Sequence, residues 1–152
     1  MYPLIVAMAG VVLLTAHLAM TVPVEVQRER HLAGDVAAAN FHAYRKAAVD
    51  YYNANPTFSG AIPAGSMTFP LGYISTGAWA NVVDSGTLYT YSTAVPTPEA
   101  AEAIFERGGR SMMIGKKVTG NTMTSLNGAA SGFTLPATLS ALPVGIVVVI
   151  GN

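Results

Sequence analysis

The first 24 residues constrain the fold most, because they contain a long run without a charged side chain. Residues 2–24 include no Asp, Glu, Lys or Arg, and charged residues begin at Glu25. A helix of that length spans about 34 Å, more than the roughly 30 Å hydrocarbon core of a bilayer. In lipid, a stable segment must satisfy its own backbone hydrogen bonds, so the run is expected to be helical. We therefore predict a transmembrane anchor over residues 1–24.

A cleaved signal peptide is the main alternative for this segment. Such a peptide requires a basic stretch before its apolar core and a small-x-small cleavage site. Nothing basic precedes the core here, and residues 17–20 make a poor cleavage site, so the anchor is favoured. An ionisable residue within a span is costly and often functional, but we prefer to interpret His17 as a neutral side chain that bonds to a neighbouring helix.

Three small residues within the run, Ala7, Gly10 and Ala16, would allow another membrane helix to approach closely. They are the candidate packing positions of the anchor, whether the neighbour is a second copy of the chain or another protein. The basic residues that follow the run are Arg28, Arg30, Arg45 and Lys46. The positive-inside rule alone would place the rest of the chain in the cytoplasm. Acidic residues interleave with these positions, so charge alone does not decide the orientation.

Residues 25–55 carry a second helical pattern, which is apolar on one side only. The apolar positions, at steps of three, four and five, are Leu32, Val36, Phe41, Tyr44, Ala48 and Tyr51 or Tyr52. This period predicts an amphipathic helix. Pro56 should end the helix, whereas Pro23 at the junction is expected to kink it. The candidate interaction surface consists of Val36, Phe41, Tyr44 and Tyr51. We expect it to pack on the rest of the chain or on a partner helix.

After Pro56 the composition shifts to Gly, Pro, Ser, Thr and Asn, with short β-prone runs between them. Residues 78–83 and 87–93 flank Asp84-Ser85-Gly86 and predict a hairpin. A short helix should follow, with Thr97 as its N-cap and Pro98 in its first turn, and it should stop at Gly108-Gly109.

Three further strands are expected, at residues 111–118, 123–126 and 145–150. The last is an almost unbroken Val/Ile run, which predicts a central strand buried on both faces. The predicted fold class is α+β: a long N-terminal helix packed on a mostly antiparallel sheet, with one short helix. The predicted domains are the anchor (1–24), the amphipathic helix (25–55) and a β-rich domain (56–152).

Composition and spacing exclude most kinds of catalytic chemistry. The chain has no cysteine, which rules out thiol catalysis and thiolate metal sites. Its formal net charge is zero, so no basic field is available for nucleic acid. His31 and Asp35 lie one helical turn apart, but His42 is about 16 Å further along the axis. We therefore expect no metal site and no cofactor.

Charged side chains around the short helix are expected to face solvent. Glu99, Glu102 and Glu106 line one side of it, and catalysis by paired carboxylates would need a second acid, for which Asp84 is the candidate. The basic patch, also expected on the surface, consists of Arg107, Arg110, Lys116 and Lys117. Neither a nucleophile elbow nor a proper phosphate loop is found in the sequence. The sequence predicts that the chain is not an enzyme.

The order of span, proline near position 23, amphipathic helix and β-rich domain resembles the layout of type IV pilins. Two features differ from that family. The sequence lacks a basic leader with a glycine cleavage site, and Leu4, Ile5 and Val6 occupy the region where a mature pilin carries glutamate.

A closer resemblance is to the PilM family of type IVb thin-pilus systems, which are found on conjugative plasmids. The matching segments are Phe69-Pro70-Leu71-Gly72-Tyr73, Trp79-Ala80-Asn81, Leu88-Tyr89-Thr90-Tyr91, residues 111–115, Asn127-Gly128 and Leu142-Pro143. The resemblance implies a single-pass protein of the bacterial inner membrane with a periplasmic C-terminal domain. It also implies work in the pilus basal body or pilin transport apparatus, with other assembly proteins, pilin and membrane lipid as partners.

The leading hypothesis is therefore a non-catalytic component of pilus assembly. A minor-pilin-like subunit that enters the filament is the second hypothesis, and recovery in sheared pili would distinguish it. A membrane-tethered enzyme is the third, to be tested by alanine substitutions at His42, Asp84, Glu99 and Lys116.

Overall fold

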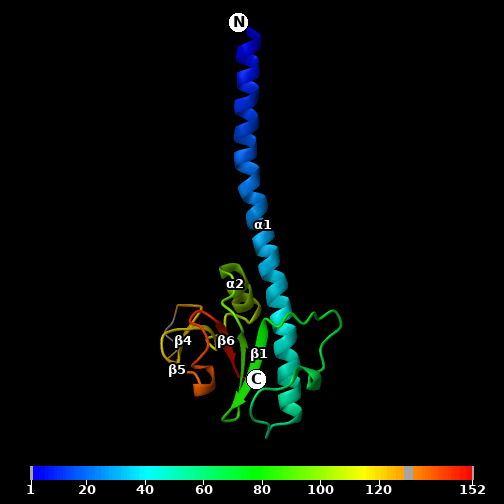
Figure 1. Ribbon diagram of the computed structural model, residues 1–152, viewed down its shortest axis with the longest axis vertical. Helices are drawn as coiled ribbons and strands as arrows, with labels where there is room; N and C mark the ends of the chain where they lie inside the picture. Colours follow the sequence, from blue (N-terminus) through cyan, green and yellow to red (C-terminus); the bar gives the residue numbers. More distant parts are fainter. Residues whose placement is uncertain (1, 129–131, 152) are drawn as a thin grey trace.

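One helix forms the first third of the chain in the computed structural model, which describes the backbone of residues 2–128 and 132–151. Side chains are described for Val12 and for residues 24–128 and 132–151. Helix α1 covers Tyr2–Ala54, a length of about 80 Å. Its N-terminal half extends well beyond the rest of the fold (Figure 1). Pro23 lies inside α1 without ending it, and the predicted end just before Pro56 is confirmed.

Within the residues that the structure describes in full, no helix is long and apolar enough to cross a membrane. The predicted anchor lies largely outside those residues, because no side chain between Val12 and Val24 is described. The same holds for the residues singled out within it, Ala7, Gly10, Ala16 and His17.

The described residues contain one six-stranded sheet beside the C-terminal half of α1. Its order is β1-β2-β6-β3-β4-β5, and every neighbouring pair is antiparallel. The strands are β1 (Trp79–Asp84), β2 (Thr87–Ser92), β3 (Ile114–Lys117), β4 (Thr122–Ser125), β5 (Phe133–Thr134) and β6 (Val147–Ile150). The remaining elements are α2 (Pro98–Arg107) and two 3-10 turns, η1 (Ala64–Ser66) and η2 (Ala137–Leu139). The predicted α+β class is confirmed.

Strand β6 is the buried central strand that its Val/Ile run predicts. It pairs with β2 on one side and β3 on the other. Because successive side chains of a strand point to opposite faces, Val147 and Val149 join the cluster of Phe41 beneath α1 and α2. Val148 faces the other way, into the cluster that contains Leu139 of η2. The sheet therefore has a core on both faces.

The turn between β1 and β2 and the start of α2 both form as their local sequences predict. Ser85 and Gly86 have positive φ angles of 51° and 75°, as a type I′ hairpin turn requires, and they join β1 to β2. The Thr97 hydroxyl accepts a hydrogen bond from the Ala100 backbone N–H at 3.2 Å, so α2 begins as predicted. The buried side of α2 is confirmed at Ala101, Ile104 and Phe105.

Two predictions for β3 and its surroundings need correction. The strand is shorter than residues 111–118, because the Ile114 backbone N–H bonds to the Ser111 carbonyl at 3.1 Å and forms a turn there. The surface position expected for Lys117 is wrong, since this residue is only 3% exposed. Its ammonium group donates to the carbonyls of Ser140, at 2.8 Å, and Leu142. Lys117 thus ties the segment after η2 to the sheet.

Candidate interaction surface

The four residues predicted as an interaction surface occupy different environments on α1. Phe41 is fully buried and Tyr44 is 7% exposed, both within the chain's own core. Tyr51 is half-buried and packs edge-to-face on Phe58, with ring centroids 5.5 Å apart. Val36, in contrast, is 70% exposed. The structure therefore leaves Val36 on the surface and packs the other three against the chain's own domain.

Residues 56–78 pass around the C-terminal end of α1, in part on the side away from α2 (Figure 1), and pair with the outer edge of β1 at Gly60. Gly60 and Val83 exchange two backbone hydrogen bonds of 2.9 Å. Further along β1, the buried Asn81 amide accepts from the Ile62 N–H at 2.8 Å and donates to the Ile62 carbonyl at 3.3 Å. It also donates to the Tyr44 hydroxyl at 2.7 Å. One side chain of β1 thereby satisfies both backbone groups of Ile62 and holds the covering segment at the sheet edge.

Aromatic rings hold the same segment against α1. Phe69 and Tyr73 stack with centroids 4.2 Å apart and planes 8° from parallel. Tyr44 on α1 stacks on Phe69 at 6.0 Å. Stacked rings of this kind stabilise a contact beyond the area that they bury. The aromatic motif singled out in the sequence therefore fixes the position of a loop.

Asn40 on α1 connects this loop to β1. Its side-chain oxygen accepts a hydrogen bond from Trp79 Nε1 at 2.7 Å, and its amide nitrogen donates to the Ile74 carbonyl at 2.9 Å. Val36 precedes Asn40 by about one helical turn. The network thus holds the backbone of Ile74 against α1 at Asn40, one turn after Val36.

Residues 70–73 form a rigid turn with an apolar tip. The Tyr73 backbone N–H donates to the Pro70 carbonyl at 3.1 Å, and Gly72 has a φ of 87°, as the third position of a type II turn requires. Leu71 at the tip is fully exposed, and Ile74 is 70% exposed. We call these two exposed side chains, Leu71 and Ile74, the apolar surface.

A hollow of about 260 Å³ lies between α1 and α2. Its polar and charged lining residues are His31, Asp35, Glu99, Glu102, Glu106 and Arg107. The Arg107 guanidinium is 4.0 Å from the Asp35 carboxylate, and both side chains are largely exposed, so this ion pair contributes little to stability. Among the residues that the structure describes, no group of three His, Asp or Glu side chains is placed to hold a metal ion.

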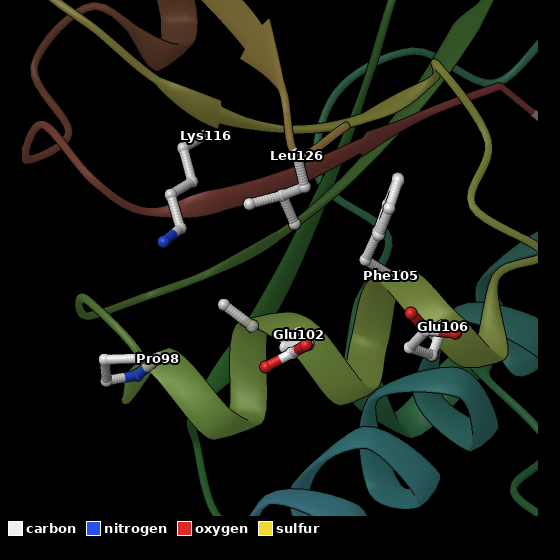
Figure 2. A pocket seen from close by; sticks show the side chains of 7 residues that line it. Pro98, Glu102, Phe105, Glu106, Lys116 and Leu126 are labelled. Atoms are coloured by element: carbon white, nitrogen blue, oxygen red, sulfur yellow. The ribbon is translucent and has the colours of Figure 1, made fainter. Parts of the chain in front are cut away.

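A second hollow, of about 250 Å³, opens between α2 and the sheet (Figure 2). Phe105 forms part of its apolar wall, Lys116 reaches from β3 toward α2, and Glu102 and Glu106 lie along the helix. Glu106 accepts hydrogen bonds from Arg110, the shorter at 2.6 Å, and these lower the pKa of its carboxylate. Its lining, within the described part of the chain, contains no Ser, Cys or His.

His42 lies at the contact between α1 and α2. Its Nε2 donates to the Ile104 carbonyl at 3.0 Å, and its ring packs edge-to-face on Phe41. Burial lowers the pKa of His42 below the ordinary value, although the bond to Ile104 opposes this effect. The positive charges of Arg45 and Arg107 act in the same direction as burial. The folded chain therefore favours neutral His42.

We predict that the full chain loses stability as the pH falls below about 6.5, the ordinary pKa of histidine. The unfolded chain then binds a proton that folded His42 resists, so the stability present above that pH declines until the lowered pKa is passed. Urea unfolding at about pH 7.5 and about pH 5.5 measures the loss, which His42→Gln should reduce. His31→Gln is the matched control, since His31 is an exposed histidine of the same helix. An equal pH dependence in wild type and His42→Gln would contradict the prediction.

The residues considered for catalysis are not brought together. His42 is enclosed between the two helices, whereas Asp84 ends β1 near Tyr52, whose hydroxyl donates to the carbonyl of the hairpin turn. Tyr52 lies about 15 Å further along α1 than His42. Glu99 and Lys116 line different hollows. These four positions offer no shared reaction centre.

The fold and its surfaces define a class of protein. It is an α+β chain in which a protruding helix carries a sheet domain with exposed apolar side chains. A family model described as PilM matches residues 4–150. The chain belongs to the PilM family, which relates it to the biogenesis of type IVb pili.

The crystal structure of a PilM protein from Escherichia coli B7A has a similar fold. It superposes with a TM-score of 0.58 at 19% sequence identity, over 79% of this chain and 92% of that one. Among curated proteins, no match to the chain is found.

Proposed function

We propose that this chain is a non-catalytic component of pilus assembly, held in the bacterial inner membrane by residues 1–24 with its β-rich domain in the periplasm. Membership of the PilM family supports the connection to pili. The uncharged run at residues 2–24 supports the anchor, because its length suits a bilayer core. An assembly component of this kind works by holding partners together at the membrane.

The observation that carries this proposal is the apolar surface. Leu71 is fully exposed, yet the turn that displays it is closed by a backbone hydrogen bond and based on the stacked rings of Phe69 and Tyr73. A side chain that is held rigidly before binding loses little conformational entropy when a partner covers it. Large exposed apolar patches often mark interaction sites, and here two exposed apolar side chains lie three residues apart on one loop. Leu71 and Ile74 therefore suit a contact with another assembly protein.

The proposal predicts that charges at Leu71 and Ile74 disrupt assembly without releasing the chain from the envelope. The tagged full chain carrying Leu71→Glu and Ile74→Glu should remain in the membrane fraction at wild-type level. Because a buried unpaired carboxylate costs several kcal/mol, it should lose its co-purifying proteins and reduce piliation by about tenfold or more. Val144→Glu is the matched control, since Val144 is 57% exposed and lies in the loop before β6. Normal piliation in the double variant would contradict the proposal.

Two further measurements separate the alternatives. Protease accessibility of the domain in spheroplasts tests its periplasmic position, and digestion only after lysis would contradict it. A minor-pilin-like subunit is the second candidate, favoured by the protruding helix with a domain at its end (Figure 1). That candidate requires the chain to appear in sheared pili, whereas an assembly component stays with the cells. Loss of piliation in Glu99→Ala or Lys116→Ala at unchanged protein level would contradict a non-catalytic role.

A further inference from the structure

Residues 25–30 of α1, which we call the neck, extend free of the sheet domain (Figure 1). Every side chain from Val24 to Ala33 is exposed. The next residue, Gly34, is buried and lies against the backbone of α2. The charged groups of the neck are therefore available to surroundings other than the chain's own domain.

The neck carries charges of both signs on more than one side of the helix. They belong to Glu25, Arg28, Glu29 and Arg30, all exposed. At about 100° per residue, Arg28 and Arg30 point about 160° apart around the axis, and the two carboxylates lie on the wider arc between them. One partner helix or one flat protein surface cannot contact both guanidiniums at once. A layer that surrounds the helix can contact both of them.

The headgroup layer of a bilayer is such a surrounding layer, and the neck lies at its depth if the hydrocarbon ends at Val24. The headgroup region adds about 5–8 Å beyond the hydrocarbon on each side, whereas Glu25, Arg28 and Arg30 lie about 1.5, 6 and 9 Å further along the axis. The Cα–Cβ bonds of a helix tilt toward its N-terminus, so the long Arg30 side chain reaches back toward the membrane. Gly34, about 15 Å from Val24, lies beyond the layer.

We propose that the neck binds the headgroups of zwitterionic aminophospholipids, an inference that rests on the proposed membrane anchor. Each of these headgroups contains one phosphate and one primary ammonium group. The guanidiniums of the neck donate hydrogen bonds to the phosphate oxygens, and its carboxylates accept hydrogen bonds from the ammonium groups. The neck has no net charge, whereas binding to anionic lipid uses clusters of about four to eight basic residues. Contacts on several sides of the helix then fix the depth of α1 in the bilayer.

Lipid retention by the full chain tests the chemistry of this contact. Vesicles of phosphatidylethanolamine and phosphatidylcholine in equal amounts are the probe, because only the first lipid has ammonium protons to donate. Wild type, extracted gently in detergent and analysed by native mass spectrometry, should retain at least about threefold more phosphatidylethanolamine. Glu25→Gln with Glu29→Gln should abolish this preference. Glu102→Gln with Glu106→Gln is the matched control, because these exposed glutamates have the same spacing but lie on α2.

Thiol labelling tests the depth of the neck separately, in a chain that has no cysteine of its own. The single variants Gln27→Cys and Ala33→Cys replace exposed residues of α1, about 4.5 Å and 13.5 Å beyond Val24 along the axis. In vesicles of the same composition, a membrane-impermeant maleimide should modify Gln27→Cys at least about fivefold more slowly, because headgroups surround only that position.

Four results would overturn the proposal: equal retention of the two lipids by wild type, an unchanged preference in the neck variant, equal labelling of the two cysteines, or protection of Gln27→Cys in cell envelopes but not in vesicles. The last result would assign the neck to a protein partner. If the chain stays in the vesicles until detergent is added, the anchor holds and the headgroup contact alone is wrong. If the chain is released without detergent, the proposed anchor fails, and the headgroup contact fails with it.

Discussion

Replacing Asn81 by leucine is expected to lower the free energy of unfolding of the full chain by about 3–5 kcal/mol. Leucine has a similar volume, so the change removes hydrogen bonds without opening a large cavity. It leaves the Ile62 N–H and carbonyl and the Tyr44 hydroxyl without their Asn81 partner. Asn81 is 3% exposed, and each buried polar group without a partner costs about 1–3 kcal/mol.

Urea unfolding of wild type and Asn81→Leu measures this loss. Asn53→Leu is the matched control, because Asn53 lies on the exposed side of α1 and should change stability by less than about 0.5 kcal/mol. Hydrogen exchange should also quicken at the amides of Gly60 and Val83, whose paired bonds hold residues 56–78 on β1. A loss below about 1 kcal/mol would show that the edge is closed by other contacts.

Elements specified by neighbouring residues could be predicted from the sequence. The hairpin follows from Ser85 and Gly86, which adopt the positive φ angles of its turn. Helix α2 follows from the Thr97 cap and from Pro98. The central position of β6 follows from its Val/Ile composition, which suits burial on both faces. In each case the deciding interaction spans only a few residues.

Contacts between distant residues could not be predicted in this way. Lys117 is buried because the carbonyls of Ser140 and Leu142 lie beside its ammonium group. No residue near Lys117 in the sequence indicates that these carbonyls are its partners. Strand β5 has two residues, too few for a periodic signal. Asn81 stands out in the motif with Trp79, but its hydrogen bonds to Ile62 depend on the path of the preceding loop.

The candidate interaction surface was predicted only in part, for a geometric reason. Each residue of a helix turns the side chain by about 100°, so Val36 and Phe41 point about 140° apart and cannot belong to one narrow stripe. The structure accordingly exposes Val36 and buries Phe41. The exposed Leu71 gives no periodic signal, although proline and glycine at Pro70 and Gly72 are typical of a type II turn.

The second large effect is expected at Gly34, where α1 lies directly against the backbone of α2. A Cβ atom at this position would lie 2.9 Å from both the carbonyl carbon and the oxygen of Glu99, and 3.1 Å from the nitrogen of Ala100. These are backbone atoms in the first turn of α2, so they cannot move aside as a flexible side chain can. Gly34→Val should therefore lower the free energy of unfolding by about 3 kcal/mol, as overpacking does when the backbone must shift.

Gly34→Ala sharpens the test because helix propensity and close packing predict opposite signs. Alanine in a helix interior is favoured over glycine by about 1 kcal/mol, so propensity alone predicts a more stable chain. The contact with Glu99 predicts a net loss instead, since even one methyl group must displace α2. Ala33→Val is the control, because Ala33 is the exposed neighbour on the same turn and should cost less than about 1 kcal/mol. Stabilisation by Gly34→Ala would mean that α2 can shift freely, and the hollow between α1 and α2 could then not have a fixed shape.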